Sequence, residues 1–115
     1  MKHLRTLFIL LILPLISINA TVPAQEVVIK IASHCDHFEQ CETGKSRLEK
    51  EFGLTKGIKS AKFDCTAMTV TVKYNPKRCN PDQIRQVISK AGYDADDVKA
   101  DPKGQAKLDG CCQKK

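Results

Sequence analysis

Three stretches of the chain have the hydrophobic pattern of β-strands. Residues 26–32 are rich in β-branched side chains, and residues 58–65 and 68–74 alternate apolar with polar side chains, as strands with one buried face do. A tight turn near residues 66–67 joins the last two stretches. The pattern therefore predicts a first strand followed, later in the chain, by an amphipathic hairpin.

Two further stretches have apolar spacings of three and four residues, which are typical of helices. The first covers about residues 43–52, and we expect Gly53 to end it. The second begins with Asn80-Pro81-Asp82-Gln83, which combines a capping residue, a proline at the first helical position and the glutamine of a capping box. Gly92 ends this helix, and residues 93–98 are predicted to form a short last strand.

The resulting order, β-α-β-β-α-β, predicts an α+β, ferredoxin-like fold with a four-stranded antiparallel sheet and two helices on one face. Right-handed crossovers then place the loop after the first strand, the hairpin and the Gly92-Tyr93 turn at one end of the sheet. We therefore expect Cys35, Cys41, Cys65 and Tyr93 toward that end and Cys79 at the other.

The N-terminal residues have the features of a secretory signal peptide. Lys2 and Arg5 precede an apolar run, residues 7–18, that is followed by small residues at Ala20 and Ala24. This run is shorter than the roughly 20 residues that a membrane span requires. We expect residues 1–20 to be the signal, with cleavage after Ala20 or after Ala24. The mature chain would then lie in the periplasm or outside the cell, with no stable membrane span.

This interpretation divides the chain into the signal, a domain over residues 25–98 and a polar, cysteine-containing tail over residues 99–115. The full chain has 115 residues with 19 Lys or Arg and 13 Asp or Glu, a formal charge of +6. Removing Lys2 and Arg5 leaves 17 basic against 13 acidic groups, or +4. This modest excess is spread along the chain, which argues against nucleic-acid binding. We also predict no enzyme, because one small domain leaves little room for a catalytic cleft and no catalytic motif occurs.

Six cysteines in so short a chain are the unusual feature of the composition. His34, Cys35, His37 and Cys41 lie within eight residues, on a loop that leads into a predicted helix start. Thiolates and imidazoles are the ligands that Cu(I) and Zn prefer, and a helix N-terminus favours the thiolate form of Cys41. The alternative is a Cys35–Cys41 disulfide in an oxidising compartment, which would make the chain a structural or interaction domain.

The other cysteines also have more than one interpretation. Cys65 is either a buried thiol or an accessory ligand, and Cys79 could form a disulfide with the tail. Cys111 and Cys112 are candidates for such a bridge, for accessory ligands or for exposed thiols. They do not readily bridge each other, because the side chains of adjacent cysteines diverge. Six cysteines allow 15 full pairings, and the sequence selects none of them.

Three motifs resemble the heavy-metal-associated domain family, which includes copper chaperones, metal-transporting ATPases and the periplasmic mercury-binding protein. They are Thr55-Lys56-Gly57-Ile58-Lys59-Ser60-Ala61, Met68-Thr69-Val70-Thr71-Val72-Lys73-Tyr74-Asn75-Pro76 and Ala91-Gly92-Tyr93-Asp94. The resemblance implies the ferredoxin-like fold, a bound metal ion, and a metal transporter or another metal-binding protein as partner. It also implies a function: an exported protein that binds or hands over a soft ion of the copper, zinc or mercury type.

The family binds its metal through M-x-C-x-x-C, and this motif is altered here. Cys41 matches the first cysteine, Gly44 stands in place of the second, and a longer loop with His34, Cys35 and His37 precedes them. A Cys35/Cys41 pair with histidine ligands would replace the family site, and mixed nitrogen and sulfur ligation shifts the preference from Cu(I) toward Zn. Tyr93 matches the family position that packs beside the metal loop.

Overall fold

The computed structural model describes residues 22–32, 37–40 and 43–110 of the chain. Four strands and three helices occur within these residues. In chain order they are β1 (Gln25–Ala32), α1 (Lys45–Leu54), β2 (Ile58–Asp64), β3 (Thr69–Tyr74), α2 (Pro81–Lys90), β4 (Asp94–Ala95) and α3 (Pro102–Ala106).

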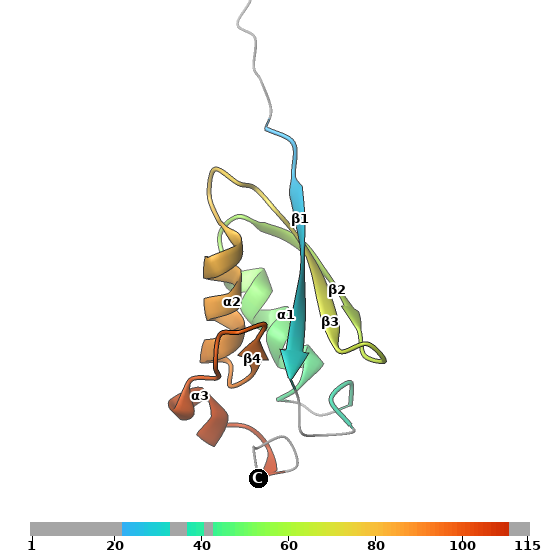
Figure 1. The fold of residues 1–115 in the computed structure, drawn as a ribbon, viewed down its shortest axis with the longest axis vertical. Coiled ribbons are helices and arrows are strands. Elements are labelled where there is room, and N and C mark those ends of the chain that lie inside the picture. The colour runs from blue at the N-terminus through green and yellow to red at the C-terminus, as the bar shows by residue number, and fades with distance from the viewer. Residues whose placement is uncertain (1–21, 33–36, 41–42, 111–115) are drawn as a thin grey trace, which may run out of the picture.

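The strands form one antiparallel sheet in the order β2-β3-β1-β4, and α1 and α2 run alongside it (Figure 1). This is the α+β, ferredoxin-like fold that the sequence predicts. In the register of the two central strands, Ile29 lies opposite Val70 and Val27 opposite Val72. Side chains of alternate residues point to opposite faces of a strand, so Ile29 is buried while its neighbour Val28 is 60% exposed.

The core lies between the sheet and the two long helices. It contains β-branched residues of β1 and β3, the apolar residues of α1 and α2, and part of the turn between α2 and β4. Its largest fully buried side chains are Ile29, Ile31, Val70, Val72, Leu48, Ile84, Ile88 and Tyr93. The hydrophobic periods of the sequence therefore identify most of the core.

The start of α2 follows the prediction, but the end of α1 does not. Asn80 Oδ1 accepts a hydrogen bond from the Gln83 backbone at 2.9 Å, and Gln83 Oε1 accepts one from the Asn80 backbone at 3.1 Å. The prediction that Gly53 ends the first helix is wrong, because α1 continues through it to Leu54. The helix ends at Thr55, whose amide donates to Phe52 O and whose hydroxyl donates to a carbonyl of the preceding turn.

The last strand is also shorter than predicted, since β4 holds only Asp94 and Ala95 of the expected residues 93–98. The chain turns at Asp96, which has a positive φ of 53°, and Val98 then bridges back to Ala95. This turn is held by the Asp96 carboxylate, which accepts a hydrogen bond from the Lys30 amide at 2.9 Å. A short polar side chain tolerates this left-handed conformation better than most residues do.

The segment after Val98, to which the hydrophobic pattern assigns no element, forms the short helix α3. Asp101 caps it by accepting a hydrogen bond from Lys103 N at 3.0 Å. Leu108, just beyond α3, is only 4% exposed and joins the core. No helix within the described residues has the length and apolar character needed to cross a bilayer.

Candidate metal centre

The end of the domain that carries the hairpin also gathers the described part of the predicted metal loop. Phe38, from residues 37–40, packs its ring against Phe63 of β2 and Tyr93, with ring centroids 6.1 and 5.3 Å away. Cys65 directly follows β2 at this end. The first strand ends and α1 begins there as well (Figure 1).

Cys79 lies at the opposite end, as the topology predicts. It precedes Asn80, the residue that caps α2, and is 4% exposed. Its Cβ would be 2.8 Å from a Cβ placed on Gly57, in the connection between α1 and β2. The other candidate ligands, His34, Cys35, Cys41, Cys111 and Cys112, lie outside the described residues.

Phe38 anchors the middle of the cysteine-bearing loop. Its side chain is 3% exposed, and its carbonyl accepts a hydrogen bond from the Lys45 amide at 3.0 Å. An edge-to-face contact with Tyr93 adds to the burial of the ring. Because Phe38 lies three residues from both Cys35 and Cys41 in the sequence, its burial ties the stretch between them to the core.

Tyr93 links this anchor to the start of α1. It is 1% exposed, and its hydroxyl donates a hydrogen bond of 2.7 Å to the carbonyl oxygen of Thr43. Thr43 immediately precedes Gly44, the residue that caps α1. A single buried side chain therefore contacts Phe38 and also holds the backbone that leads from the loop into the helix.

Charged side chains surround the position of Cys65. The ammonium nitrogen of Lys45 lies 3.9 Å from a Glu39 carboxylate oxygen and 3.7 Å from one of Glu49. Burial raises the pKa of the Cys65 thiol, the carboxylates of Glu39, Asp64 and Glu49 raise it further, and Lys45 opposes them. Cys65 is therefore a protonated thiol at neutral pH, and a metal ion that binds it has to displace the proton.

His37 is exposed and lies in a turn in which its carbonyl accepts a hydrogen bond from the Gln40 amide at 2.8 Å. No group of three or more His, Cys, Asp or Glu side chains in the described part of the chain is arranged to hold a metal ion. His37 and Cys65 are thus the described members of the predicted ligand set, and they do not form a metal site by themselves.

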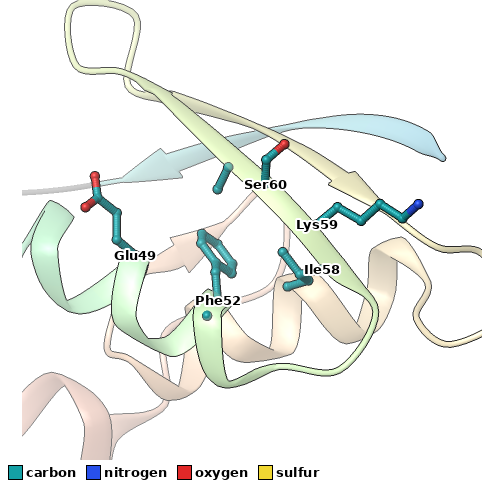
Figure 2. A pocket seen from close by; sticks show the side chains of 7 residues that line it. Glu49, Phe52, Ile58, Lys59 and Ser60 are labelled. Atoms are coloured by element: carbon teal, nitrogen blue, oxygen red, sulfur yellow. The ribbon is translucent and has the colours of Figure 1, made fainter.

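A groove of about 380 Å³ lies between α1 and the edge strand β2. Figure 2 shows the Phe52 ring in the middle of this groove and Glu49 at one side of it. Its remaining lining residues are Gly53, Ile58, Lys59, Ser60 and Ala61. Glu49 is the one carboxylate among them and no thiol or imidazole is present, so the groove lacks the donor set of a soft-metal site.

Three residues that sequence reasoning did not select shape this end of the domain. Phe38 is the one aromatic residue in the polar stretch 33–43, and that contrast could have identified it as an anchor. Leu108 is an isolated apolar residue among polar ones, which is a weaker signal. Thr43 has no distinguishing sequence signal, because its role depends on contacts with residues 50 and 66 positions away.

The described elements form a small α+β domain with a ferredoxin-like fold. Residues 40–94 match the model of the heavy-metal-associated domain. The family domain is a metal-binding fold without catalytic activity, in agreement with the absence of an enzyme motif from the sequence.

A curated relative is the copper-exporting P-type ATPase of Bacillus subtilis (strain 168), which is 32% identical over 53 residues. The alignment covers 46% of this chain and 7% of the ATPase, so the similarity concerns one small domain of a far longer protein.

Solved structures share the fold at low sequence identity. The N-terminal domain of a potential copper-translocating P-type ATPase from Bacillus subtilis, solved in its Cu(I)-loaded state, has a TM-score of 0.55 at 24% identity, over 64% of this chain and 86% of that domain. Oxidized MerP from Ralstonia metallidurans CH34 has a TM-score of 0.54 at 12% identity, over 64% and 94% of the two chains. The CopZ metallochaperone has a TM-score of 0.52 at 22% identity, over 62% and 98%.

Proposed function

We propose that this chain is an exported heavy-metal-binding protein that binds a soft transition-metal ion and hands it to another protein. The family match over residues 40–94 supports metal binding, and the N-terminal signal pattern supports export to the periplasm or the cell exterior. A metal transporter or a second metal-binding protein is the partner that this function requires.

The ligands in this proposal are Cys35 and Cys41, assisted by His34 and His37. The burial of Phe38 is the observation that carries it, because this ring ties the loop between the two cysteines to the domain core. A tethered loop loses less conformational entropy on closing around an ion than a free one does. Cys65, at the same end, is an accessory ligand in this proposal. Tyr93 is a neighbour of the site that holds the Thr43 carbonyl, where the chain leads from the loop into α1.

The donor types restrict the choice of ion. Two thiolates alone suit Cu(I), whereas two thiolates with two imidazoles give the tetrahedral site that Zn prefers. Gly44 occupies the position of the second family cysteine and contributes no side-chain donor. The histidines therefore decide the preference, and their removal should favour Cu(I) over Zn.

The test is a metal titration of the reduced mature chain and its single-cysteine variants. Cys35→Ser and Cys41→Ser should each lower the affinity for Cu(I) and Zn by at least about 100-fold, since loss of a direct ligand exceeds loss of an outer-shell partner. Cys79→Ser is the matched control, because Cys79 lies at the far end of the domain, and it should titrate like the parent. Unchanged stoichiometry and affinity in both loop variants would refute the assignment.

Protein isolated from its native compartment distinguishes metal binding from the alternative, a Cys35–Cys41 disulfide. Thiols are blocked immediately after release from the native compartment, and the modified cysteines and the metal content are then read by mass spectrometry. Our proposal predicts free Cys35 and Cys41 thiols together with bound metal. A complete Cys35–Cys41 bridge without metal would instead make the chain a disulfide-stabilised structural or interaction domain.

Export is tested separately with residues 1–24 fused to a reporter enzyme that has no signal of its own. We expect the reporter outside the cytosol, and we expect N-terminal sequencing of the native protein to begin at Thr21 or Gln25. A reporter retained in the cytosol would contradict this part of the proposal.

A further inference from the structure

Two connections that are far apart in the sequence meet at the end of the domain opposite the hairpin. They are residues 55–57, between α1 and β2, and residues 75–80, between β3 and α2. The amide of Asn75 donates a hydrogen bond of 2.7 Å to Gly57 O, and a Cβ placed on Gly57 would lie 2.9 Å from the Cβ of Arg78. Figure 1 shows both connections at the opposite end of the molecule from α3. The fold therefore joins them into one surface.

Hydrogen bonds within the connections hold this surface in place. Asn75 Oδ1 accepts a bond from the Lys77 amide, and Asn75 O accepts bonds from the amides of Arg78 and Cys79, each at 3.0 Å. The Thr55 amide donates to the last turn of α1 at 3.1 Å. A surface that is ordered in advance loses little conformational entropy when it binds a partner.

The surface is basic. Lys56, Lys77 and Arg78 are exposed, and the two connections contain no acidic residue. None of the ion pairs found among the described residues involves these three side chains. The carboxylates that flank the surface have basic neighbours of their own: Glu26 lies 3.4 Å from Lys73, Asp82 lies 2.9 Å from Arg85, and Glu51 lines a groove between α1 and α2 with Arg47 and Lys90. Three positive charges are therefore available to a partner.

Leu54 adds an apolar side chain to this surface. It is the last residue of α1, directly before Thr55, and it is 72% exposed. Among the described residues, Val28 on the sheet is the other exposed large hydrophobic residue. An apolar side chain beside several lysines or arginines is typical of surfaces that lie in the interface of an anionic membrane. We call the surface formed by Leu54, Lys56, Lys77 and Arg78 the basic end.

The chain that precedes β1 also joins the domain beside the basic end. In the register of the sheet, Gln25 and Ile58 both lie opposite Tyr74, so the first strand starts next to the two connections. The apolar run over residues 7–18 ends seven residues before Gln25, and seven residues span at most about 25 Å. While that run lies in a bilayer, the basic end is therefore held near the membrane surface.

We propose that the basic end docks on the surface of an anionic membrane. The three cationic side chains approach the lipid phosphates, and Leu54 enters the boundary between headgroups and acyl chains. An acidic protein would match the charges equally well, but the entry of the chain from an apolar run favours a membrane. In this orientation the opposite end of the domain, with Phe38 and Cys65, faces away from the bilayer.

The first experiment measures binding of the mature chain to lipid vesicles, with a chelator present so that metal ions have no influence. Vesicles of phosphatidylcholine and phosphatidylglycerol in equal parts are compared by sedimentation with vesicles of phosphatidylcholine alone. Binding should require the anionic lipid, and it should be lost in about 1 M salt, where charges are screened beyond about 3 Å. Equal binding to both kinds of vesicle, or binding to neither, would overturn the proposal.

Neutralising the basic end should abolish most of this binding. The combined changes Lys56→Gln, Lys77→Gln and Arg78→Gln should lower the partition coefficient roughly 100-fold, because each basic residue at an anionic surface contributes about fivefold. The variant should unfold in urea at the parent midpoint, since these side chains take part in no ion pair among the described residues. A folded variant that binds like the parent would refute the proposal.

The matched control removes the same charge elsewhere. Lys62→Gln, Lys103→Gln and Lys107→Gln change exposed residues of β2, of α3 and of the position just after α3. The loss of binding should stay below about threefold, because charges more than about 10 Å from the membrane surface are largely screened. Equal losses in the two triple variants would mean that net charge alone attracts the chain, and would overturn the assignment of the basic end.

Tryptophan fluorescence tests the orientation, because the chain contains no tryptophan. Leu54→Trp should shift its emission to shorter wavelength on anionic vesicles and should be quenched by brominated lipid. Val28→Trp, on the sheet, is the control and should keep its spectrum. An unchanged spectrum of Leu54→Trp, or the same shift at both positions, would overturn the proposed orientation.

An acidic protein partner and the proposed metal binding are both distinguishable from membrane docking. Binding of the parent chain to polyglutamate but not to vesicles would assign the basic end to an acidic protein and refute the membrane. Metal titration of the Lys56, Lys77 and Arg78 variant should give the parent affinities, because the basic end lies opposite the metal loop. Vesicle binding can therefore fail while metal binding stands, and the reverse also holds.

Discussion

Replacing Gly104 with alanine should detach the C-terminal segment from the domain. The added Cβ would overlap the Lys90 carbonyl and would lie 2.9 Å from Gly92 N, and both are backbone atoms that a side-chain rotation cannot move. Gly92 also has a positive φ of 105°, so its own backbone has little freedom to yield. We expect α3 to separate from α2 in this variant.

The size of the effect follows from the contacts that would be lost. Exposing the Leu108 side chain costs about 1.5–3 kcal/mol, and the bonds between Ser89 and the segment contribute about 0.5–1.5 kcal/mol each. The released segment regains conformational entropy, which offsets part of this sum. The net loss of unfolding free energy should be about 2–4 kcal/mol.

Urea denaturation followed by circular dichroism measures this loss. The midpoint should fall by roughly 1–3 M for a domain of this size. Gly110→Ala is the matched control, because no atom lies within 4 Å of a Cβ at that position, and it should leave the midpoint unchanged. A Gly104→Ala midpoint equal to that of Gly110→Ala would show that the packing of α3 does not stabilise the domain.

Three further substitutions and one labelling experiment test other parts of the structure. Gly53→Ala should add about 0.5–1 kcal/mol in thermal unfolding, because this helical position is open; a loss would contradict the position of the α1 terminus. Phe38→Ala should cost about 3 kcal/mol, and an unchanged melt would show that the ring is no anchor. Burial raises the pKa of Asp96, but hydrogen bonds from Arg85 and the Lys30 amide outweigh it and hold this pKa below its usual value. The ionised Asp96 carboxylate therefore stabilises the folded state above about pH 4, and this stabilisation is lost as the pH falls through the lowered pKa. Asp96→Asn should therefore be less stable than the parent at pH 7 and converge with it in acid; parallel pH curves would refute this. Cys79 is buried, and burial also raises the pKa of its thiol, so an alkylating reagent should reach it only when the whole domain unfolds. Its alkylation should therefore accelerate with urea; rapid labelling in buffer would contradict this expectation.

The sheet and the second helix could be predicted because their determinants are local. Alternation through Val70 and Val72 identifies a strand with one buried face, and the reciprocal bonds of Asn80 and Gln83 lie within four residues of sequence. The end of α1 could not be predicted in the same way. Glycine commonly ends helices, which is why the sequence predicts that Gly53 ends this one. The helix instead ends at Thr55, where the backbone amide and the hydroxyl donate hydrogen bonds to carbonyls of the last turn.

The sequence predicts which types of ligand the candidate site contains, but it does not predict how the residues around the site are arranged in space. The sequence places thiols and imidazoles together between residues 34 and 41, which is sufficient to propose a soft-metal loop. A lone aromatic residue in this polar stretch marks Phe38 as a candidate anchor, but the sequence does not indicate that Tyr93 is the residue against which it packs. It also gives no indication that Thr43 accepts a bond from a residue 66 positions later.

The sequence by itself determined the α+β fold, the polarity of the sheet faces and the residue types available to a metal ion, since each depends on short-range periodicity or on composition. The tertiary structure decided which residues meet at the end of the sheet. Phe38, Tyr93 and Thr43 come together there with Asp109, although their separations range up to 71 residues. Contacts at such separations depend on how the layers pack, and a one-dimensional pattern does not contain that information.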